Sequence, residues 1–445
     1  MPKPLPKTAP RPIGIDLFAG AGGLSLGFEQ AGFDVVAAVE IDPIHCCVHK
    51  FNFPNCAVIP KSVVGLTGKE IRSKAGIGSA TVDVVFGGAP CQGFSMIGHR
   101  VIDDPRNALV KEFVRIVEEL NPKHFVFENV KGITIGNHRK LLDEIIEEFH
   151  GIGYKVAEPW KVLNANQYSV PQDRQRLILL GSRRGCPIIS YPAPTVTPAG
   201  RAKQSSIPVG PSCRDALSDL PNAESYESLW MTDAVRFRPK KNKSDYAKEM
   251  SCESEGAWHF GVKRRWDPAI LTSSMRTEHT EISRMRFART SGGLVEPISR
   301  LFKLPADGIA NTLRAGTDAA RGAFTSPRPI HYAYPRLITV REMARLHGYP
   351  DWFRFHVTKW HGARQIGNSV PPPLARAVAS EVMRALGRVP SICSTEIDLG
   401  EIKLLNMDMS EACGYWGVPS PIGRRDRKSG NKKRKQMSTL LASAG

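Results

Sequence analysis

Two residues that could act together as a nucleophile and an acid follow neighbouring strand patterns in this sequence. Cys91 ends the run GGAPC (87–91), which comes directly after the apolar segment Val82–Phe86. Glu128 ends the next such segment, His124–Glu128. Because the carboxyl ends of parallel strands face one ligand crevice, we expect the thiol and the carboxyl at the same edge. Such a pair is suited to nucleophilic and acid catalysis on a heteroaromatic ring.

Two arginines extend this constellation. The segment QDRQR (172–176) precedes the apolar run Leu177–Leu180, and alternation along an extended chain puts Arg174 and Arg176 on one face. The glycines and polar residues from Gly93 to Arg106 predict a mobile loop that could cover a substrate. A lone cysteine is more often a buried core residue, and it is these neighbouring motifs that favour a catalytic Cys91.

A glycine-rich turn marks a second site. The strand pattern Ile13–Phe18 runs into AGAGG (19–23) and a helix, and a second strand pattern ends in Glu40. Glycines let the backbone approach a ligand, and an acid about 20 residues after the turn is placed to bind ribose hydroxyls. These features indicate a cofactor that contains adenosine. A tight turn without any ligand is the plainer alternative. Nicotinamide dinucleotide enzymes share the layout, but the turn is not GxGxxG, which disfavours a pyrophosphate ligand.

A sheet is needed to position these residues, and short apolar runs alternate with amphipathic stretches along the chain. The expected strands are Ile13–Phe18, Val35–Glu40, Val82–Phe86, His124–Glu128 and Leu177–Leu180. The expected helices are Leu24–Gln30, Ala108–Leu120, Arg139–Phe149, Thr339–Leu346 and Pro373–Leu386. This order predicts an α/β fold with a doubly wound, mostly parallel sheet.

The alternation breaks near Cys186. Residues 187–335 are rich in Pro, Gly, Ser and Arg and predict a separate, irregular module. We expect a disordered N-terminus (1–12), a catalytic and cofactor-binding domain (13–186, completed by 361–390), a smaller irregular domain (187–360), and a C-terminal extension with a basic tail (391–445).

The net charge of +18 favours a polyanionic partner such as nucleic acid, or an anionic membrane surface. Residues 421–445 hold eight Lys or Arg and one acid, so the remaining chain is basic by itself. No apolar run approaches the ~20 residues of a membrane span, and the N-terminus lacks a signal-peptide pattern. We expect a soluble, intracellular protein. The nine cysteines show no CxxC spacing, so neither a disulfide framework nor a metal site is expected.

Six short segments together resemble the DNA cytosine-5 methyltransferase family, in its bacterial single-chain form. In family order they are DLFAGAGG (16–23), GGAPCQGFS (87–95), FENV (127–130), QDRQR (172–176), RLITVREMARLHGYPDWF (336–353) and RQIGNSVPP (364–372). They span nearly all of residues 13–382. The resemblance implies a Rossmann-like domain that binds S-adenosyl-L-methionine, with residues 187–360 as a target recognition domain.

The resemblance also implies a role for each matching residue. Cys91 would attack carbon 6 of cytosine, Glu128 would hold and protonate ring nitrogen 3, Arg174 would contact the base, and Arg176 would support it. The residues that would bind the cofactor are Phe18, Gly20, Gly22, Gly23, Glu40, Ile41, Ser62, Pro90, Asn368, Ser369 and Val370. Ser62 departs from the family, which often has an Asp near the adenine at the equivalent place.

The implied reaction yields S-adenosyl-L-homocysteine and 5-methylcytosine in double-stranded DNA, and the target base must be flipped out of the duplex to react. A short Thr-Leu element of such recognition domains resembles Thr312-Leu313. The basic residues that could contact DNA in this domain are Arg276, Arg284, Arg286, Arg289, Arg314 and Arg321. We expect a monomer in the bacterial cytoplasm, associated with the nucleoid through DNA, with a cognate restriction endonuclease acting separately.

Three rival functions are compatible with parts of the pattern. A tRNA cytosine-5 methyltransferase would share the whole catalytic apparatus. A nucleotide-dependent oxidoreductase with a redox Cys91 would leave FENV and QDRQR unexplained. A DNA-binding scaffold without activity would have no need of the intact Cys91, Glu128 and Arg174. Transfer of a labelled methyl group to duplex DNA, to tRNA or to neither separates the two methyltransferases from each other and from the two rivals that transfer no methyl group.

Overall fold

A mixed eight-stranded sheet forms the centre of the computed structural model, which describes residues 10–90, 107–200, 206–316 and 327–420. Its strands are β1 (Ile13–Leu17), β2 (Asp34–Val39), β3 (Ala57–Ile59), β4 (Val84–Gly87), β5 (His124–Val130), β6 (Tyr154–Val156), β7 (Lys161–Asn164) and β8 (Gln175–Arg183). The order is β3-β2-β1-β4-β5-β8-β6, with β7 also on β8. Strands β1 to β5 are parallel, and β8 is antiparallel to β5, β6 and β7.

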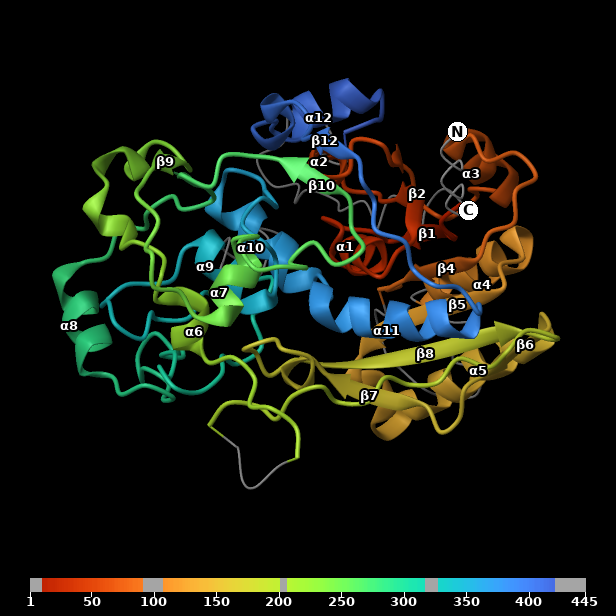
Figure 1. Cartoon of the computed structure of the whole chain (residues 1–445), viewed down its shortest axis with the longest axis horizontal. Coiled ribbons are helices and arrows are strands. Elements are labelled where there is room, and N and C mark those ends of the chain that lie inside the picture. Colours follow the sequence, from red (N-terminus) through yellow and green to blue (C-terminus); the bar gives the residue numbers. More distant parts are fainter. Residues whose placement is uncertain (1–9, 91–106, 201–205, 317–326, 421–445) are drawn as a thin grey trace, which may run out of the picture.

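Helices cover both faces of this sheet because successive strand residues point to opposite sides. Val85 and Phe125 pack toward α4 (Ala108–Leu120) and α5 (Arg139–Gly151), together with the smaller α3 (Gly68–Ala75). Phe86 and Val126 pack toward the opposite face, against α1 (Gly23–Gln30) and α11 (Pro372–Ala385). Helices α1 and α11, from the two ends of the family domain, lie side by side over the strands (Figure 1). The predicted doubly wound, mostly parallel sheet is confirmed.

Apart from short 3-10 helices, the described residues of the irregular region form only brief α-helices and strands, as its composition predicts. They are α6 (Cys213–Leu217), β9 (Val235–Arg236), α7 (Asp245–Met250), β10 (Lys263–Arg265), β11 (Ile270–Leu271) and α8 (Glu281–Arg289). They surround α9 (Val340–His347) and α10 (Lys359–Asn368), beside the sheet in Figure 1. Helix α9 begins with a capping box between Thr339 and Glu342 and ends at Gly348 in the left-handed conformation.

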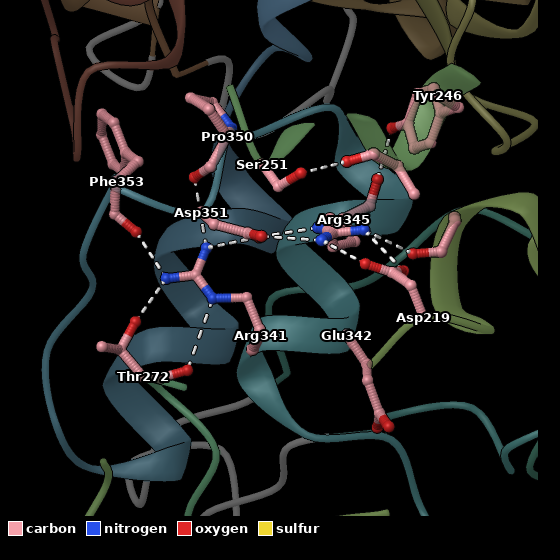
Figure 2. Close-up of polar contacts among 12 residues, drawn as sticks. Asp219, Tyr246, Ser251, Thr272, Arg341, Glu342, Arg345, Pro350, Asp351 and Phe353 are labelled. Atoms are coloured by element: carbon pink, nitrogen blue, oxygen red, sulfur yellow. Dashed lines mark hydrogen bonds and ion pairs between the residues drawn. The ribbon is translucent and has the colours of Figure 1, made fainter. Parts of the chain in front are cut away.

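A buried cluster of charges fastens α9 to this region (Figure 2). The Arg345 guanidinium is 1% exposed and donates to both carboxylate oxygens of Asp219, at 3.1 and 3.0 Å, and to both of Asp351. Arg341, equally buried, donates to Thr272 Oγ1 at 2.7 Å and to the carbonyl of Phe353 at 2.8 Å. The two arginines and two aspartates balance in charge, which lets the group be buried.

After α11 the chain forms a separate two-stranded sheet with the irregular region and then packs against α2. Strand β12 (Glu396–Asp398) pairs in parallel with β10, and a 3-10 helix (Ile402–Leu405) and α12 (Met409–Trp416) pack against α2 (Pro43–Asn52). Figure 1 shows α12 and β12 together beside α2. Among the described residues no helix has the length and apolar character needed to cross a membrane.

Candidate active site

The carboxyl ends of the parallel strands form one edge where most of the predicted site residues meet. β1 leads into the glycine turn, β2 into Glu40, β4 into the run 87–90, and β5 ends around Glu128. Because β8 is antiparallel to β5, the amino end of β8 carries Arg176 to this same edge. Cys91 and the predicted mobile loop up to Arg106 lie outside the described residues, so the site is built here up to Pro90.

Glu128 lies directly against the segment that leads to Cys91. A Cβ at Gly88 would overlap Oε2 of Glu128, so only glycine fits there without displacing the carboxylate. Asn129 Nδ2 donates to the carbonyl oxygen of Ala89 at 2.9 Å, which ties the end of β5 to the same segment. Pro90 is exposed. The described geometry therefore brings the Glu128 carboxyl next to the last residues before Cys91.

Arg176 is the arginine that pairs with Glu128. Its Nε lies 2.7 Å from Oε1 of Glu128, and each side chain is 12% exposed. Burial raises the pKa of Glu128 above its ordinary value, while Arg176 and then Arg174 oppose this rise. The result is a carboxyl that holds its proton to higher pH than a surface glutamate does, as an acid for a ring nitrogen requires.

Arg174 is fully buried and contacts backbone oxygens instead of Glu128. Its guanidinium donates to the carbonyl of Leu313 at 3.1 Å, of Gly367 at 2.7 Å and of Ser369 at 2.8 Å. Burial lowers its pKa to about 9. The residue thus joins the recognition region to the end of α10. The direct base contact that the resemblance implies for Arg174 stays a prediction.

The Thr312-Leu313 element docks beside QDRQR. Thr312 Oγ1 donates to the carbonyl of Asp173 at 2.6 Å, and the Leu313 amide donates to Gln172 Oε1 at 3.1 Å. The next residue, Arg314, is exposed, and its backbone packs so closely on Gly367 that a Cβ at that glycine would overlap it. The element therefore brings the edge of the recognition region next to the catalytic edge.

The glycine turn and Glu40 form one hydrogen-bonded unit. Glu40 Oε2 accepts from the Gly20 amide, and Oε1 accepts from the Asp42 amide, both at 2.8 Å. Gly20 and Gly22 adopt φ of +56° and +98°, in the left-handed region that favours glycine. A Cβ at Gly20 would meet no atom within 4 Å, so the turn faces open space, as a cradle for a ligand does.

The late segment closes this turn from the far side. A Cβ at Gly23 would overlap the carbonyl oxygen of Val370 and lie 2.7 Å from the Tyr349 hydroxyl. Asn368 and Ile41 are exposed, and Phe18 and Ser369 are half-buried. The turn, Glu40 and the 368–370 segment are thus brought together. Ser62 lies beyond β3, where its Oγ accepts from the Val64 amide at 3.1 Å.

A buried polar chain beneath the turn was not predicted. Ser25 Oγ donates to Asp16 Oδ2 at 2.6 Å and lies 3.1 Å from His49 Nε2. Burial raises the pKa of Asp16 to about 8 and lowers that of His49 to about 3, so both groups favour their neutral forms. The signal in the sequence is the acid in the otherwise apolar strand IGIDL.

The candidate DNA-contacting arginines differ in their surroundings. Arg276 stacks on Trp230, with its guanidinium carbon 4.1 Å from the ring centre. Arg284 pairs with Glu224, and Arg286 lies 3.8 Å from Glu296. Arg289 and Arg314 are exposed. Arg321 lies outside the described residues.

Comparison with known proteins agrees with this geometry. Residues 14–384 match the family model of C-5 cytosine-specific DNA methylases. The chain is 58% identical over 418 residues to the Type II methyltransferase M.XorII of Xanthomonas oryzae pv. oryzae, covering 94% of this chain and 95% of that one. It is 34% identical over 376 residues to the Type II methyltransferase M1.HphI of Haemophilus parahaemolyticus, covering 83% and 86%.

A solved structure agrees as well. The crystal structure of a protein described as a DNA modification methyltransferase encoded within an E. coli prophage superposes with a TM-score of 0.66 and 31% identity, covering 85% of this chain and 100% of that one. The chain therefore belongs to the C-5 cytosine-specific DNA methylases, enzymes that methylate cytosine in DNA with S-adenosyl-L-methionine as the methyl donor.

Proposed function

We propose that this enzyme methylates carbon 5 of one flipped-out cytosine in a specific duplex sequence, through a covalent adduct of Cys91 at carbon 6. The observation that carries the proposal is the Glu128 carboxyl, held by Arg176 and seated against the Gly88–Pro90 segment that runs into Cys91. An acid this close to a nucleophile can protonate a nitrogen of the cytosine ring while the nucleophile attacks a carbon of the same ring.

The chemistry follows from the weak nucleophilicity of carbon 5. The Cys91 thiolate adds to carbon 6 while Glu128 gives its proton to nitrogen 3, so the ring electrons move toward carbon 5. S-adenosyl-L-methionine, when bound by the glycine turn and the 368–370 segment, would supply an electrophilic methyl group to carbon 5 and leave as S-adenosyl-L-homocysteine. Loss of the carbon 5 proton to a base restores the double bond and expels the Cys91 thiolate, and nitrogen 3 returns its proton to Glu128. Arg176 keeps Glu128 in place and limits the rise of its pKa.

Arg174, proposed to contact the base, also supports the site from within the protein. It holds the carbonyls of Leu313, Gly367 and Ser369, and so fixes the recognition region and the cofactor-closing segment relative to the catalytic edge. The proposed cofactor contacts are those of the glycine turn, Glu40, Ile41, Ser62, Pro90 and the segment 368–370, supported by the open space above Gly20 and by the close packing of Gly23 on Val370.

Residues 187–360 are the proposed target recognition domain. The short elements around α9 and the docking of Thr312-Leu313 beside the catalytic edge support this assignment. Both relatives named above are Type II methyltransferases, so we propose that the chain is the modification enzyme of such a system, with a separate endonuclease. A tRNA substrate is not favoured, because the matching family model is one of DNA methylases.

Duplex DNA with 5-fluorocytosine at the target tests the adduct directly. Fluorine cannot leave carbon 5 as a cation, so the methylated adduct should persist as a complex that survives denaturing electrophoresis. It should form only with S-adenosyl-L-methionine. Cys91→Ala should abolish it, while Cys186→Ala and Cys213→Ala should not. A Cys91→Ala enzyme that methylates DNA at the normal rate would refute the mechanism.

A further inference from the structure

The segment Glu396–Trp416, called the C-terminal brace below, lies beyond the residues that the family model matches. It comprises β12, the 3-10 helix and α12. It does not stand apart from the enzyme, because it contacts two elements next to the cofactor site. These two elements belong to opposite ends of the family domain.

The first contact is with α2, which begins directly after Glu40-Ile41-Asp42. Trp416 Nε1 donates to the carbonyl of Pro43, the first residue of α2, at 3.2 Å, and lies 3.2 Å from Cys47 Sγ. Leu404, Leu405 and Ala412 share a buried apolar cluster with residues of α2 and with Ala21 of the glycine turn. The brace thus packs against the helix that follows the ribose-binding acid.

The second contact is with the segment that leads into α10. The Val357 amide donates to the carbonyl of Leu405 at 3.1 Å. His356 Nδ1 accepts from the Thr358 amide at 3.2 Å, which leaves Nε2 to donate to the carbonyl of Met407 at 3.0 Å. Helix α10 starts at Lys359, two residues after Val357. It ends at Asn368, the first residue of the segment that closes the glycine turn.

We propose that the C-terminal brace positions α2 and α10 relative to each other and so sets the affinity for S-adenosyl-L-methionine. This rests on the proposed assignment of Glu40, Ile41 and the 368–370 segment to the cofactor site. A brace of this kind adds no atom to the site. It adds a second connection between two supports that the sheet alone does not join, beside the two hydrogen bonds between Asn52 of α2 and the Arg354 backbone.

The test compares two neighbouring aromatic residues of α12 in the full-length enzyme. Tyr415 is 45% exposed, whereas Trp416 contacts Pro43 and Cys47. The affinity for S-adenosyl-L-homocysteine is measured by calorimetry, and the affinity for unmethylated duplex DNA is measured without cofactor. Trp416→Leu should weaken the binding of S-adenosyl-L-homocysteine by about 3- to 10-fold, the value of one hydrogen bond with its packing, and leave DNA affinity unchanged. Tyr415→Leu should change neither.

Trp416→Phe keeps an apolar ring and loses the N–H donor. Its affinity for S-adenosyl-L-homocysteine should therefore lie between those of the wild type and Trp416→Leu. A folded Trp416→Leu enzyme with unchanged cofactor affinity would overturn the proposal. Equal losses of cofactor and DNA affinity, with a lower Tm, would also overturn it, because they would show a general structural role. The 5-fluorocytosine experiment has a separate readout. If no stable complex with 5-fluorocytosine DNA formed, but Trp416→Leu weakened only cofactor binding, the covalent adduct would be rejected and the role of the brace would stand.

Discussion

Burial and a neighbouring cation have opposite effects on the pKa of Glu128. Burial favours its neutral form, and the Arg176 guanidinium at 2.7 Å favours its anion. A carboxyl that gives a proton to a ring nitrogen and recovers it in each turnover benefits from a raised pKa, because its protonated form persists to higher pH. The pair is therefore expected to set how the rate of methyl transfer depends on pH.

The protonated form of Glu128 is the active one in the proposed mechanism. Its raised pKa keeps that form populated to higher pH, and the rate should fall as pH rises through this pKa. Arg176→Leu removes the neighbouring cation, so the pKa of Glu128 should rise further and the alkaline fall in rate should move to higher pH. Single-turnover rates across pH measure this. A fall that stays in place, or moves to lower pH, would contradict the role given to Arg176.

Gly88 offers a test that leaves every polar group in place. Gly88→Ala puts a methyl group where Oε2 of Glu128 lies, so the carboxylate must shift. We expect single-turnover methylation to fall by about 100-fold, the scale for a misplaced acid, with cofactor affinity retained. Gly132→Ala is the matched control just after β5, because its added Cβ would have only Val130 Cγ2, at 3.9 Å, within 4 Å. Equal single-turnover rates for the two variants would show that catalysis does not depend on the position of Glu128 against Gly88.

Helix α9 illustrates how an element outside the sheet is held. Its own capping box and glycine C-cap define its ends, but Arg341 and Arg345 fix its place by reaching Asp219, Thr272 and Asp351. Breaking a buried ion pair leaves a charge without compensation, which costs far more than the pair contributes. The cluster in Figure 2 should therefore be sensitive to loss of any one acid.

Asp219→Ala tests this sensitivity. It leaves Arg345 buried with Asp351 as its remaining acid, and the free energy of unfolding should fall by about 3–5 kcal/mol. Asp307→Ala breaks an exposed pair with Arg214 and should lower the free energy of unfolding far less, because solvent screens that pair. Chemical denaturation of both variants measures the difference. Similar losses would mean that the buried cluster contributes no more than a surface pair.

The main elements were predictable because apolar periodicity marks them. Ala108–Leu120 is a helix with the predicted bounds, and the strand before the glycine turn ends one residue earlier than predicted, at Leu17. The direction of β8 was not predictable, since periodicity is the same for parallel and antiparallel strands. The partners of Arg174 were also hidden, because they are backbone oxygens more than a hundred residues away in the chain. The position of Cys91 within the site remains a prediction.

At the scale of the whole molecule, the recognition region and the sheet domain are joined by more than a linker. Arg264 donates through Nη2 to Glu29 of α1 at 2.7 Å, and the Phe260 amide donates to the carbonyl of Gln30. One apolar cluster also combines Ala19 and Leu26 with residues of α6, α7 and α9. A segment of the predicted recognition domain therefore serves to anchor it on the catalytic domain.

This anchoring determines how target specificity should be transferred. Residues 267–335 of this chain should be placed in a related enzyme in exchange for its corresponding segment. If the host keeps its own counterpart of the anchoring segment 258–266, the hybrid should methylate the DNA site of this enzyme. Sequencing after bisulfite treatment reads the methylated site. An active hybrid that keeps the host's site would show that specificity resides elsewhere. A hybrid that also exchanges the anchor at 258–266 should have lower stability, because Arg264 would lose its fitted partner Glu29.

The packing of Gly23 against Val370 determines when, during synthesis of the chain, the glycine turn can be closed. The two residues are about 350 positions apart, and a ribosome adds roughly 5–20 residues each second, so the glycine turn waits roughly 20–70 s for the segment that closes it. During synthesis the first strands can pair while α1 still lacks its partner α11. Under the proposed cofactor assignment, a newly made chain can close its methyl-donor site only after Val370 has been synthesised, and shorter partial chains should not modify DNA.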